Sequence, residues 1–152
     1  MTINKYVISL GSNINRKNNL RSALSKIENQ FEIDSVSNEY EFDCVNNHEN
    51  PKYLNQIIII NSELSSEEVN TKLKEIEFRL DKIKTKSQCT IDIDLVFIIN
   101  SNNHLATFKD KSSTILPYIV LPCAELIPHL FHPEKQQRFL ELKNQLKEIS
   151  LC

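Results

Sequence analysis

Hydrophobic positions along the chain change their spacing several times, and each spacing predicts an element of secondary structure. Short apolar or alternating stretches predict four strands, over residues 5–10, 33–41, 53–64 and 91–99. Apolar residues at intervals of three and four predict three helices, over residues 17–30, 65–80 and 134–151. The alternation over 33–41 is the least regular of the four strand patterns.

Polar or short stretches between these elements predict turns and loops. The first strand is expected to close at the turn-prone residues 11–13, and Ser65 is expected to cap the start of the second helix. The loops are predicted over residues 42–52, 82–90 and 101–114. Residues 115–121 form a short apolar segment, and residues 122–127 predict one helical turn.

The order of these elements is β-α-β-β-α-β, followed by a tail. That order predicts an α+β fold with a ferredoxin-like βαββαβ core, in which a four-stranded antiparallel sheet has both helices on one face. The additional C-terminal helix is expected on the other face, which gives three αβα layers. A length of 152 residues without an internal repeat or linker predicts a single domain over residues 1–152.

Charge and composition exclude several classes of partner. The chain is 40% hydrophobic and 25% charged, which is typical of a globular protein, and its formal net charge is −2. Without a basic field, nucleic acid and anionic membranes are not expected partners. No apolar run approaches the roughly 20 residues of a membrane span. We expect a monomer.

The cysteines and the N-terminal segment indicate a cytoplasmic protein. Four cysteines stand far apart and form no CxxC pair, so reduced thiols are expected instead of a zinc site or disulfides. The apolar stretch near the N-terminus is only five residues long and lacks the architecture of a signal peptide.

The chain contains a single glycine, Gly11. The P-loop and the dinucleotide-binding fingerprint both need several glycines, because the backbone must approach the phosphates closely. Both motifs are therefore excluded. If the protein binds phosphates, side chains and a metal ion must hold them.

Asp92 and Asp94 form the most informative pair of polar residues. Residues two apart on a strand share one face and lie about 6–7 Å apart, while Ile91 and Ile93 point into the core. Two neighbouring carboxylates repel each other and lose hydration, which a bound cation would offset. Magnesium suits one or two carboxylates together with substrate phosphates. The alternative is an edge strand with a solvated acidic face.

Lysines precede this pair at alternating positions. In an extended segment Lys82, Lys84 and Lys86 would face one way, where their ammonium groups would meet phosphate oxygens. Together with the carboxylates they indicate a site for phosphoryl transfer. The alternative is a solvated loop in a lysine-rich protein.

Five segments, in this order and spacing, carry a resemblance to a known family. They are KYVISLGSN at 5–13, NPKYLNQIIII at 50–60, IE at 76–77, TIDIDLVF at 90–97 and YIVLPCAELIP at 118–128. The chain resembles the 6-hydroxymethyl-7,8-dihydropterin pyrophosphokinases of folate synthesis. The resemblance implies a three-layer ferredoxin-like fold and transfer of the β,γ-diphosphate of ATP to the pterin hydroxymethyl group. It also implies two magnesium ions.

The resemblance also implies roles for individual residues. Asp92 and Asp94 match the ligands of the two Mg2+ ions and the catalytic centre. The pterin-binding positions match Tyr53, Asn55 and Tyr118. The nucleotide-binding positions match Glu77, Lys82 and Lys84. An aromatic face and a side-chain amide suit a flat heterocycle that forms hydrogen bonds. The alternative for both tyrosines is ordinary core packing.

Several positions depart from the family's pattern. Lys82 and Lys84 stand where the family has arginines, and Cys89 stands in the place of another arginine. The family's tryptophan before the aspartates is absent. In the pterin loop, Phe42 and Asp43 replace a threonine and a proline.

The nucleotide-binding segment of the family, which corresponds to residues 109–116, lacks its proline-histidine pair and its arginine here. Each lost donor to a transferring group typically costs about 3–4 kcal/mol. The candidate substitutes are Lys86, Lys109 and Lys111. His129 and His132 have the spacing of a metal pair, but the prolines at 128 and 133 indicate an irregular segment.

Three hypotheses follow. The first is a divergent pterin pyrophosphokinase that uses ATP and magnesium, and the second is a catalytically degenerate module of the same fold that binds a pterin or a nucleotide. The third is a ferredoxin-like interaction domain without a small-molecule site. Turnover, binding without turnover, and the absence of both distinguish them.

Overall fold

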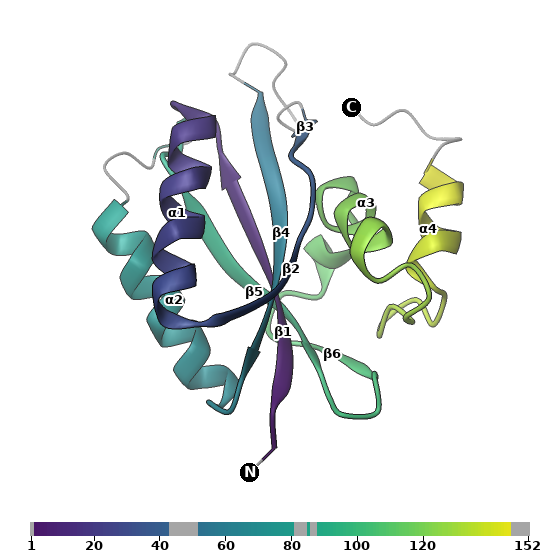
Figure 1. Cartoon of the computed structure of the whole chain (residues 1–152). Helices are drawn as coiled ribbons and strands as arrows, with labels where there is room; N and C mark the ends of the chain where they lie inside the picture. Colours follow the sequence, from purple (N-terminus) through teal and green to yellow (C-terminus); the bar gives the residue numbers. More distant parts are fainter. Residues whose placement is uncertain (1, 43–51, 81–84, 86–87, 147–152) are drawn as a thin grey trace.

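The computed structural model describes residues 2–42, 52–80, 85 and 88–146 (Figure 1). The strands are β1 (Asn4–Ser12), β2 (Glu32–Val36), β3 (Tyr40–Phe42), β4 (Tyr53–Ser62), β5 (Asp92–Ile99) and β6 (Leu105–Thr107). The helices are α1 (Arg16–Gln30), α2 (Ser66–Leu80), α3 (Pro117–Leu126) and α4 (Phe139–Leu146), with a short 3-10 helix η1 over Ser112–Ile115.

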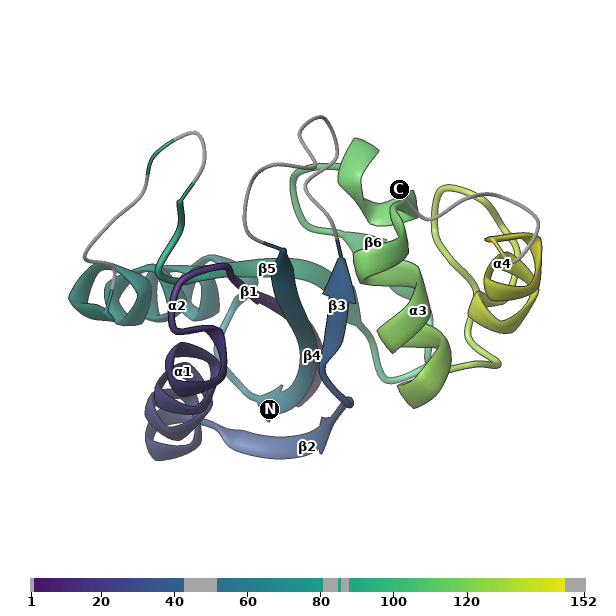
Figure 2. The same cartoon turned by 90° about the horizontal axis from the view of Figure 1, so that it is seen from above.

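The sheet confirms the predicted ferredoxin-like core. Its order is β2-β4-β1-β5-β6, β3 also pairs with β4, and every pairing is antiparallel. Helices α1 and α2 cover one face, while α3 and α4 lie on the other side with α3 nearer the sheet, which gives the three expected layers (Figures 1 and 2). The sheet of the described residues has six strands instead of four, because two short strands extend the core.

Residue alternation builds one apolar layer between the sheet and helices α1 and α2. Tyr6, Ile8 and Leu10 of β1 point into it, as do the even-numbered residues Ile58 and Ile60 of β4. The helices contribute apolar residues at helical spacing, namely Leu20, Ala23 and Ile27 from α1 and Val69, Leu73 and Ile76 from α2. Burial of such a stripe is the main source of helix stability in a folded protein.

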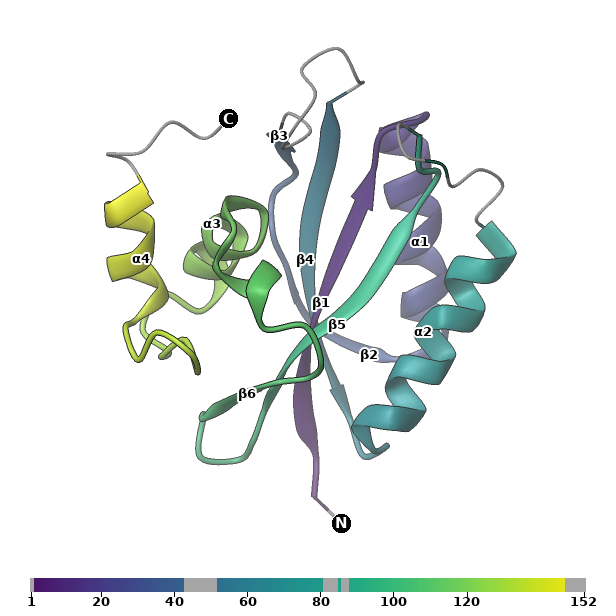
Figure 3. The ribbon, with the colours of Figure 1, turned by 180° about the vertical axis from the view of Figure 1, so that it is seen from behind.

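The opposite face, on the side of α3 and α4 (Figure 3), has its own apolar cluster. Here the alternation of β5 shifts by one residue, because Val7 of β1 pairs with Phe97 and Ile8 pairs with Leu95. A bulge of this kind places an extra residue in one strand. As a result Val96 and Phe97 both belong to this second cluster.

Local signals explain where two helices begin. The backbone N–H of Glu68 donates to the Ser65 hydroxyl at 3.2 Å, and the Ser65 N–H donates to the Glu68 carboxylate at 3.2 Å. This reciprocal capping box confirms the predicted start of α2. Pro117 occupies the first turn of α3, where the missing N–H of proline has no cost.

Four local predictions were wrong. Gly11 and Ser12 continue β1 instead of forming a turn. The stretch 33–41 contains two strands separated by residues 37–39, and the polar stretch 101–114 contains β6 and the start of η1. The last helix begins at Phe139, since residues 134–138 form turns and an isolated bridge between Phe131 and Arg138.

The predicted helical turn at 122–127 is part of the longer α3. Within the described residues, no helix has both the length and the apolar character needed to cross a bilayer.

Candidate functional site

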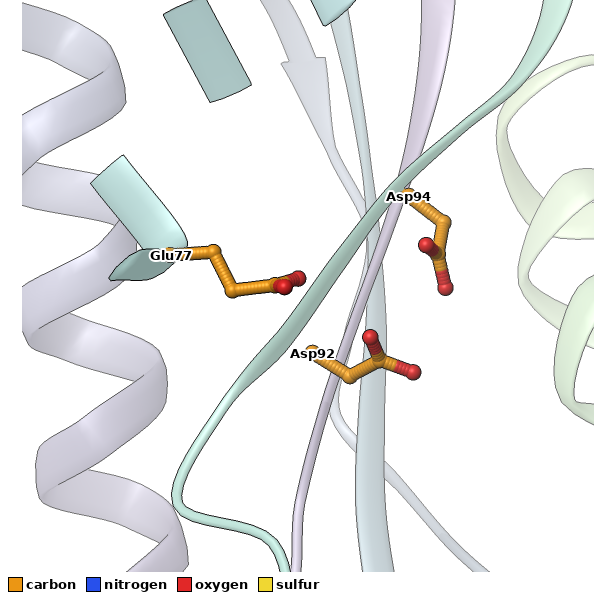
Figure 4. Close-up of side chains that lie close together, drawn as sticks. All are labelled: Glu77, Asp92 and Asp94. Carbon is orange, nitrogen blue, oxygen red and sulfur yellow. The ribbon is translucent and has the colours of Figure 1, made fainter. Parts of the chain in front are cut away.

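Asp92 and Asp94 lie at the start of β5, opposite Gly11 and Ser9 of β1. Their carboxylates project from the same side of the strand, while Glu77 reaches toward the strand from helix α2 (Figure 4). Oxygen atoms of the three carboxylates lie within 4.8 Å of one another. The alternation of β5 thus delivers two carboxylates to one face, and α2 adds a third from the side.

Glu77 and Lys74 of α2 bind the backbone of β5 at a point where no described strand pairs with its outer edge. The Ile93 N–H donates to Glu77 Oε2 at 2.7 Å, and Lys74 Nζ donates to the Ile93 carbonyl at 2.7 Å. β6 pairs with β5 only further along, at residues 97–99. Two side chains of α2 therefore take the place of a neighbouring strand beside the aspartate pair.

Lys74 also connects the carboxylates. Its Nζ donates to Asp94 Oδ1 at 2.9 Å and to Glu77 Oε2 at 3.2 Å. Burial by itself would lower the pKa of Lys74, but the carboxylates of Asp94 and Glu77 outweigh that effect and raise the pKa. Partial burial and the neighbouring charge of Asp92 raise the pKa of Asp94, against the influence of Lys74. The cluster therefore holds more negative charge than one lysine neutralises.

The aspartate pair opens into a cavity of about 360 Å3. Its volume lies in the range of small-molecule sites. The lining combines carboxylates, lysines, small polar groups and apolar side chains. It consists of Ser9, Asn70, Lys74, Asp92, Asp94, Leu95, Val96, Phe108, Lys109, Asp110, Ser113, Tyr118 and Ile119. Asp92 and Asp94 thus line a concave site, although Asp94 is exposed and the outer edge of β5 has no described partner strand at this point, as the alternative of a solvated edge strand predicted.

Tyr118 is brought into this cavity by the first turn of α3. Burial raises the pKa of its phenol, and the charges of Asp94 and Asp92 act in the same direction. Its ring packs against the second apolar cluster. The side chain therefore combines core packing with a place in the wall of the cavity.

Tyr53 and Asn55 of β4 lie next to the pair, across β1. Gly11 pairs with Asn55 on one side and with Asp92 on the other, so the three residues form one row across the sheet. A Cβ atom on Gly11 would lie 3.0 Å from Asn55 Nδ2 and 3.7 Å from the Tyr53 ring. The single glycine of the chain leaves the space that the Asn55 amide occupies.

Asn13 forms two hydrogen bonds with the segment that leads into β5. Its side-chain Oδ1 accepts from the Cys89 N–H at 2.7 Å, and its own N–H donates to the Cys89 carbonyl at 3.1 Å. Cys89 is buried. The segment after β1 therefore fixes the chain three residues before Asp92.

The remaining predicted residues have different outcomes. Asp43, Lys82, Lys84 and Lys86 lie outside the described residues. Lys109 lines the cavity and lies 5.0 Å from the centre of the Phe108 ring.

Two further residues lie away from the aspartates. Lys111 forms an ion pair with Glu134 at 3.9 Å. Phe42 pairs with Tyr53 and stacks on Tyr40, with 6.4 Å between the ring centroids.

His132 is fully buried, and backbone groups use both of its ring nitrogens. Nε2 lies 3.0 Å from the Thr114 carbonyl, and Nδ1 accepts from the N–H groups of Glu134 and Lys135 at 3.0 and 3.2 Å. A ring that donates at Nε2 and accepts at Nδ1 has no lone pair left for a metal ion. His132 therefore has a structural role and does not form a metal pair with His129.

Sequence reasoning missed Lys74, Ser9 and Asn13. Lys74 precedes Glu77 by three residues on the predicted helix, so the two side chains were predictable neighbours. Their joint contact with the backbone of Ile93 was not predictable, because it depends on where α2 packs beside β5. Ser9 and Asn13 lie in the resembling segment 5–13, whose alternation places Ser9 on the face of the aspartates.

The donor set fits magnesium. Three carboxylates offer hard oxygen atoms within 4.8 Å of one another, and the ammonium of Lys74 already bridges two of them. A cation is therefore accommodated between Asp94 and Glu77 in the folded chain. Magnesium selects such oxygen ligands and commonly shares them with substrate phosphates.

A family model described as 7,8-dihydro-6-hydroxymethylpterin-pyrophosphokinase (HPPK) matches residues 7–143. A search of the curated proteins finds no match.

Several crystal structures have the same fold. A triple mutant of Plasmodium falciparum HPPK-DHPS with STZ-DHP has a TM-score of 0.73 at 15% identity, over 99% of this chain and 45% of that chain. The wild-type protein of that organism has a TM-score of 0.72 at 15% identity, over 99% and 46%. HPPK-DHPS in complex with substrates has a TM-score of 0.73 at 15% identity, over 95% and 44%. The chain spans less than half the length of these proteins.

Proposed function

Because the chain belongs to the 7,8-dihydro-6-hydroxymethylpterin-pyrophosphokinase family, we propose that it transfers diphosphate from ATP to 6-hydroxymethyl-7,8-dihydropterin in folate biosynthesis. The observation that carries the proposal is the carboxylate cluster of Glu77, Asp92 and Asp94 at a cavity with an aromatic wall. Magnesium is the proposed cofactor. In the reaction the pterin hydroxymethyl oxygen bonds to the β-phosphorus and gives up its proton to solvent. The bond between the β-phosphorus and the oxygen that bridges to the α-phosphate breaks, and AMP leaves with that oxygen.

Asp92 and Asp94 would hold the magnesium ions. Bound magnesium neutralises phosphate charge and orients the transferring group. The backbone of β5 holds the two carboxylates on one face, because Asp92 pairs with Gly11 of β1 and Asp94 pairs with Ser9. Such fixed ligands need no rearrangement when charge shifts during transfer.

The phosphates would lie near the lysines of the cavity. Lys109 and Lys74 line it together with the aspartates, and each offers a compact positive charge on a flexible stem. Glu77 lies at the α2 side of the cluster and remains a predicted nucleotide-binding residue. Lys82 and Lys84 remain predicted nucleotide-binding residues.

The pterin would lie over the row that joins Asn55, Gly11 and Asp92. The Asn55 amide provides one acceptor and two donors, which suits the hydrogen-bonding edge of a pterin. The rings of Tyr53 and Tyr118 provide aromatic faces on the β4 and α3 sides. This arrangement would bring the hydroxymethyl group toward the aspartates, because Asn55 and Asp92 lie only two strand spacings apart, about 10 Å.

A direct assay tests the proposal. Purified protein receives ATP, magnesium and 6-hydroxymethyl-7,8-dihydropterin, and AMP and the pterin diphosphate are quantified by chromatography. We expect both products in equal amounts, and neither without the pterin or with a chelator. Folded protein that releases no AMP at saturating substrates would refute the proposal.

One observation favours a second candidate, a module that binds a pterin or nucleotide without turnover. The cationic residues of the cavity, within the described chain, are the lysines Lys74 and Lys109. Lysine lacks the bidentate fork with which arginine orients a phosphate. Calorimetry with the pterin and with a non-hydrolysable ATP analogue distinguishes the candidates, since the module binds at least one ligand but yields no AMP.

A further inference from the structure

Lys74 has an unusually complete set of partners for a half-exposed lysine. Its ammonium group has three hydrogen atoms, and three acceptors surround it within hydrogen-bond distance. These are the Ile93 carbonyl at 2.7 Å, Asp94 Oδ1 at 2.9 Å and Glu77 Oε2 at 3.2 Å. An exposed lysine ordinarily loses side-chain entropy without much gain from a single ion pair. Here one ammonium group satisfies a strand edge and two carboxylates together.

Two of these acceptors belong to carboxylates that a divalent cation at this cluster would need. Asp94 belongs to the aspartate pair, and Glu77 provides the third carboxylate of the cluster. A metal ion that binds Asp94 must therefore compete with Lys74 for the same carboxylate. A cation bound to Asp94 would also lie close to the ammonium group of Lys74, and two positive charges at close range repel each other.

Lys74 has somewhere to go when it is displaced. Its side chain is 42% exposed and lines the cavity that contains Asp92 and Lys109. The same side chain also lines a shallower hollow along α2, formed with Asn70, Thr71, Glu75, Phe78 and Arg79. A flexible stem at the junction of two hollows can redirect its ammonium group without any movement of the backbone.

We propose that Lys74 is a displaceable counter-ion, which occupies the carboxylate cluster of the unliganded protein and moves to a nucleotide phosphate when a divalent cation binds Asp94. Free cations then bind weakly, because they displace Lys74 without giving it a new partner. A cation that arrives with a nucleoside triphosphate binds well, because the phosphates receive the displaced ammonium group. Lys74 is thus a nucleotide-binding residue specific to the liganded state.

This inference rests on the proposed function, since it requires cation and nucleotide to meet at the aspartate pair. The test measures Mn2+ binding by calorimetry, first with Mn2+ alone and then in the presence of a non-hydrolysable ATP analogue. The proteins are the wild type, Lys74→Gln and the matched control Lys72→Gln. Glutamine keeps an N–H donor for the Ile93 carbonyl. Lys72 is on the same helix, but two residues away, and so points to another side of it.

We expect Lys74→Gln to bind Mn2+ alone about three- to tenfold more tightly than the wild type, because a competing charge is gone. We expect it to bind the analogue with Mn2+ about three- to tenfold more weakly, because a phosphate contact is gone. Lys72→Gln should match the wild type in both titrations. Thermal unfolding of each variant shows that the fold is retained.

Unchanged or weaker binding of Mn2+ alone by folded Lys74→Gln would overturn the inference, as would unchanged binding of the analogue. Failure of the proposed function looks different. If the two affinities move in opposite directions but no AMP is released, the counter-ion role stands and the reaction does not. If Asp92→Asn and Asp94→Asn both leave Mn2+ binding as it is, the metal lies elsewhere and both proposals fall.

Discussion

The two faces of the central sheet are made from the same strands, yet they carry different properties. Toward α1 and α2, strand β1 presents Tyr6, Ile8 and Leu10, all fully buried. From the other face of this segment, Ser9 and Gly11 approach the cavity and the Asn55 amide. One face is a continuous apolar layer, while the other combines an apolar region with a polar site.

Strand β5 shows the same division over adjacent residues. Ile91 and Ile93 are fully buried in the first cluster, whereas Asp92 and Asp94 line the cavity. Because successive side chains alternate in direction, one strand supplies the core and the site at once. Alternate residues of these strands therefore serve the stability of the core and the chemistry of the proposed site. Substitutions on the two faces should therefore affect different measurements.

We expect the greatest loss of activity from a substitution on the sheet face that carries Asp92 and Asp94. Asp92→Asn removes one of the two charges proposed to hold magnesium and should lower AMP release by about a hundredfold or more, because fixed charge stabilises the transferring group. The free energy of unfolding should change by no more than about 1 kcal/mol. The measurements are initial rates and urea denaturation. Glu28→Gln, an exposed change on α1, is the control and should leave both unchanged.

A change on the other face should do the reverse. Ile58 of β4 is fully buried toward α1 and α2 and pairs with Ile8. Ile58→Ala should reduce the free energy of unfolding by about 2–5 kcal/mol, through lost burial and a residual cavity. Urea denaturation measures this change. The KM for the pterin should stay near the wild-type value in conditions where the variant is folded. A KM that rises with the loss of stability would show that the two faces are not independent.

A substitution at Gly11 probes the sheet face of Asp92 and Asn55 without a change of charge. Its φ is not positive, so the backbone accepts alanine, but the new Cβ would lie 3.0 Å from Asn55 Nδ2. The amide must shift, and Gly11→Ala should weaken pterin binding about tenfold, equivalent to roughly one net hydrogen bond. Calorimetry with the pterin measures this. In Asn55→Ala, the added Gly11→Ala change should have little further effect, and full additivity would contradict the explanation.

Acid should cause a smaller loss of stability, which begins in the layer between the sheet and helices α3 and α4. Burial lowers the pKa of His132 below its ordinary 6.5, as does Lys135, although Thr114 and Glu134 oppose the shift. The unfolded chain then binds the proton more readily, so stability should be constant above pH 6.5 and fall by up to about 1.4 kcal/mol per pH unit below it. Urea denaturation at pH 7.5 and about 5.5 measures the loss.

His132→Gln provides the comparison for this acid effect. The variant should be less stable at neutral pH, because a buried partner of the Thr114 carbonyl is changed. Its stability should also depend less on pH in this range. The ring centroids of Phe97 and Phe139 lie 5.5 and 5.6 Å from that of His132. In acid, amide hydrogen exchange should therefore rise first around these two residues and later in the layer of α1 and α2. An identical pH profile for both proteins would exclude His132 as the cause.

The elements with local signals could be predicted from the amino-acid pattern. Alternation in β1, β4 and β5 fixed which residues face which side, and the spacing of apolar residues fixed α1 and α2. The same alternation predicted that Asp92 and Asp94 share a face. The periods of strand and helix follow from backbone geometry, and so they are visible in a few consecutive residues.

Contacts between these elements depend on how distant segments pack in the folded chain. The bulge beside Val96, the short strand β6 and the late start of α4 at Phe139 arise from pairing and packing between distant segments. The partners of Lys74 belong to this group, because Ile93 and Asp94 lie about twenty residues further along the chain. A charge and its acceptors leave no periodic signal when they are joined only by packing. The aspartate pair was therefore predictable, and the position of the Lys74 ammonium group beside it was not.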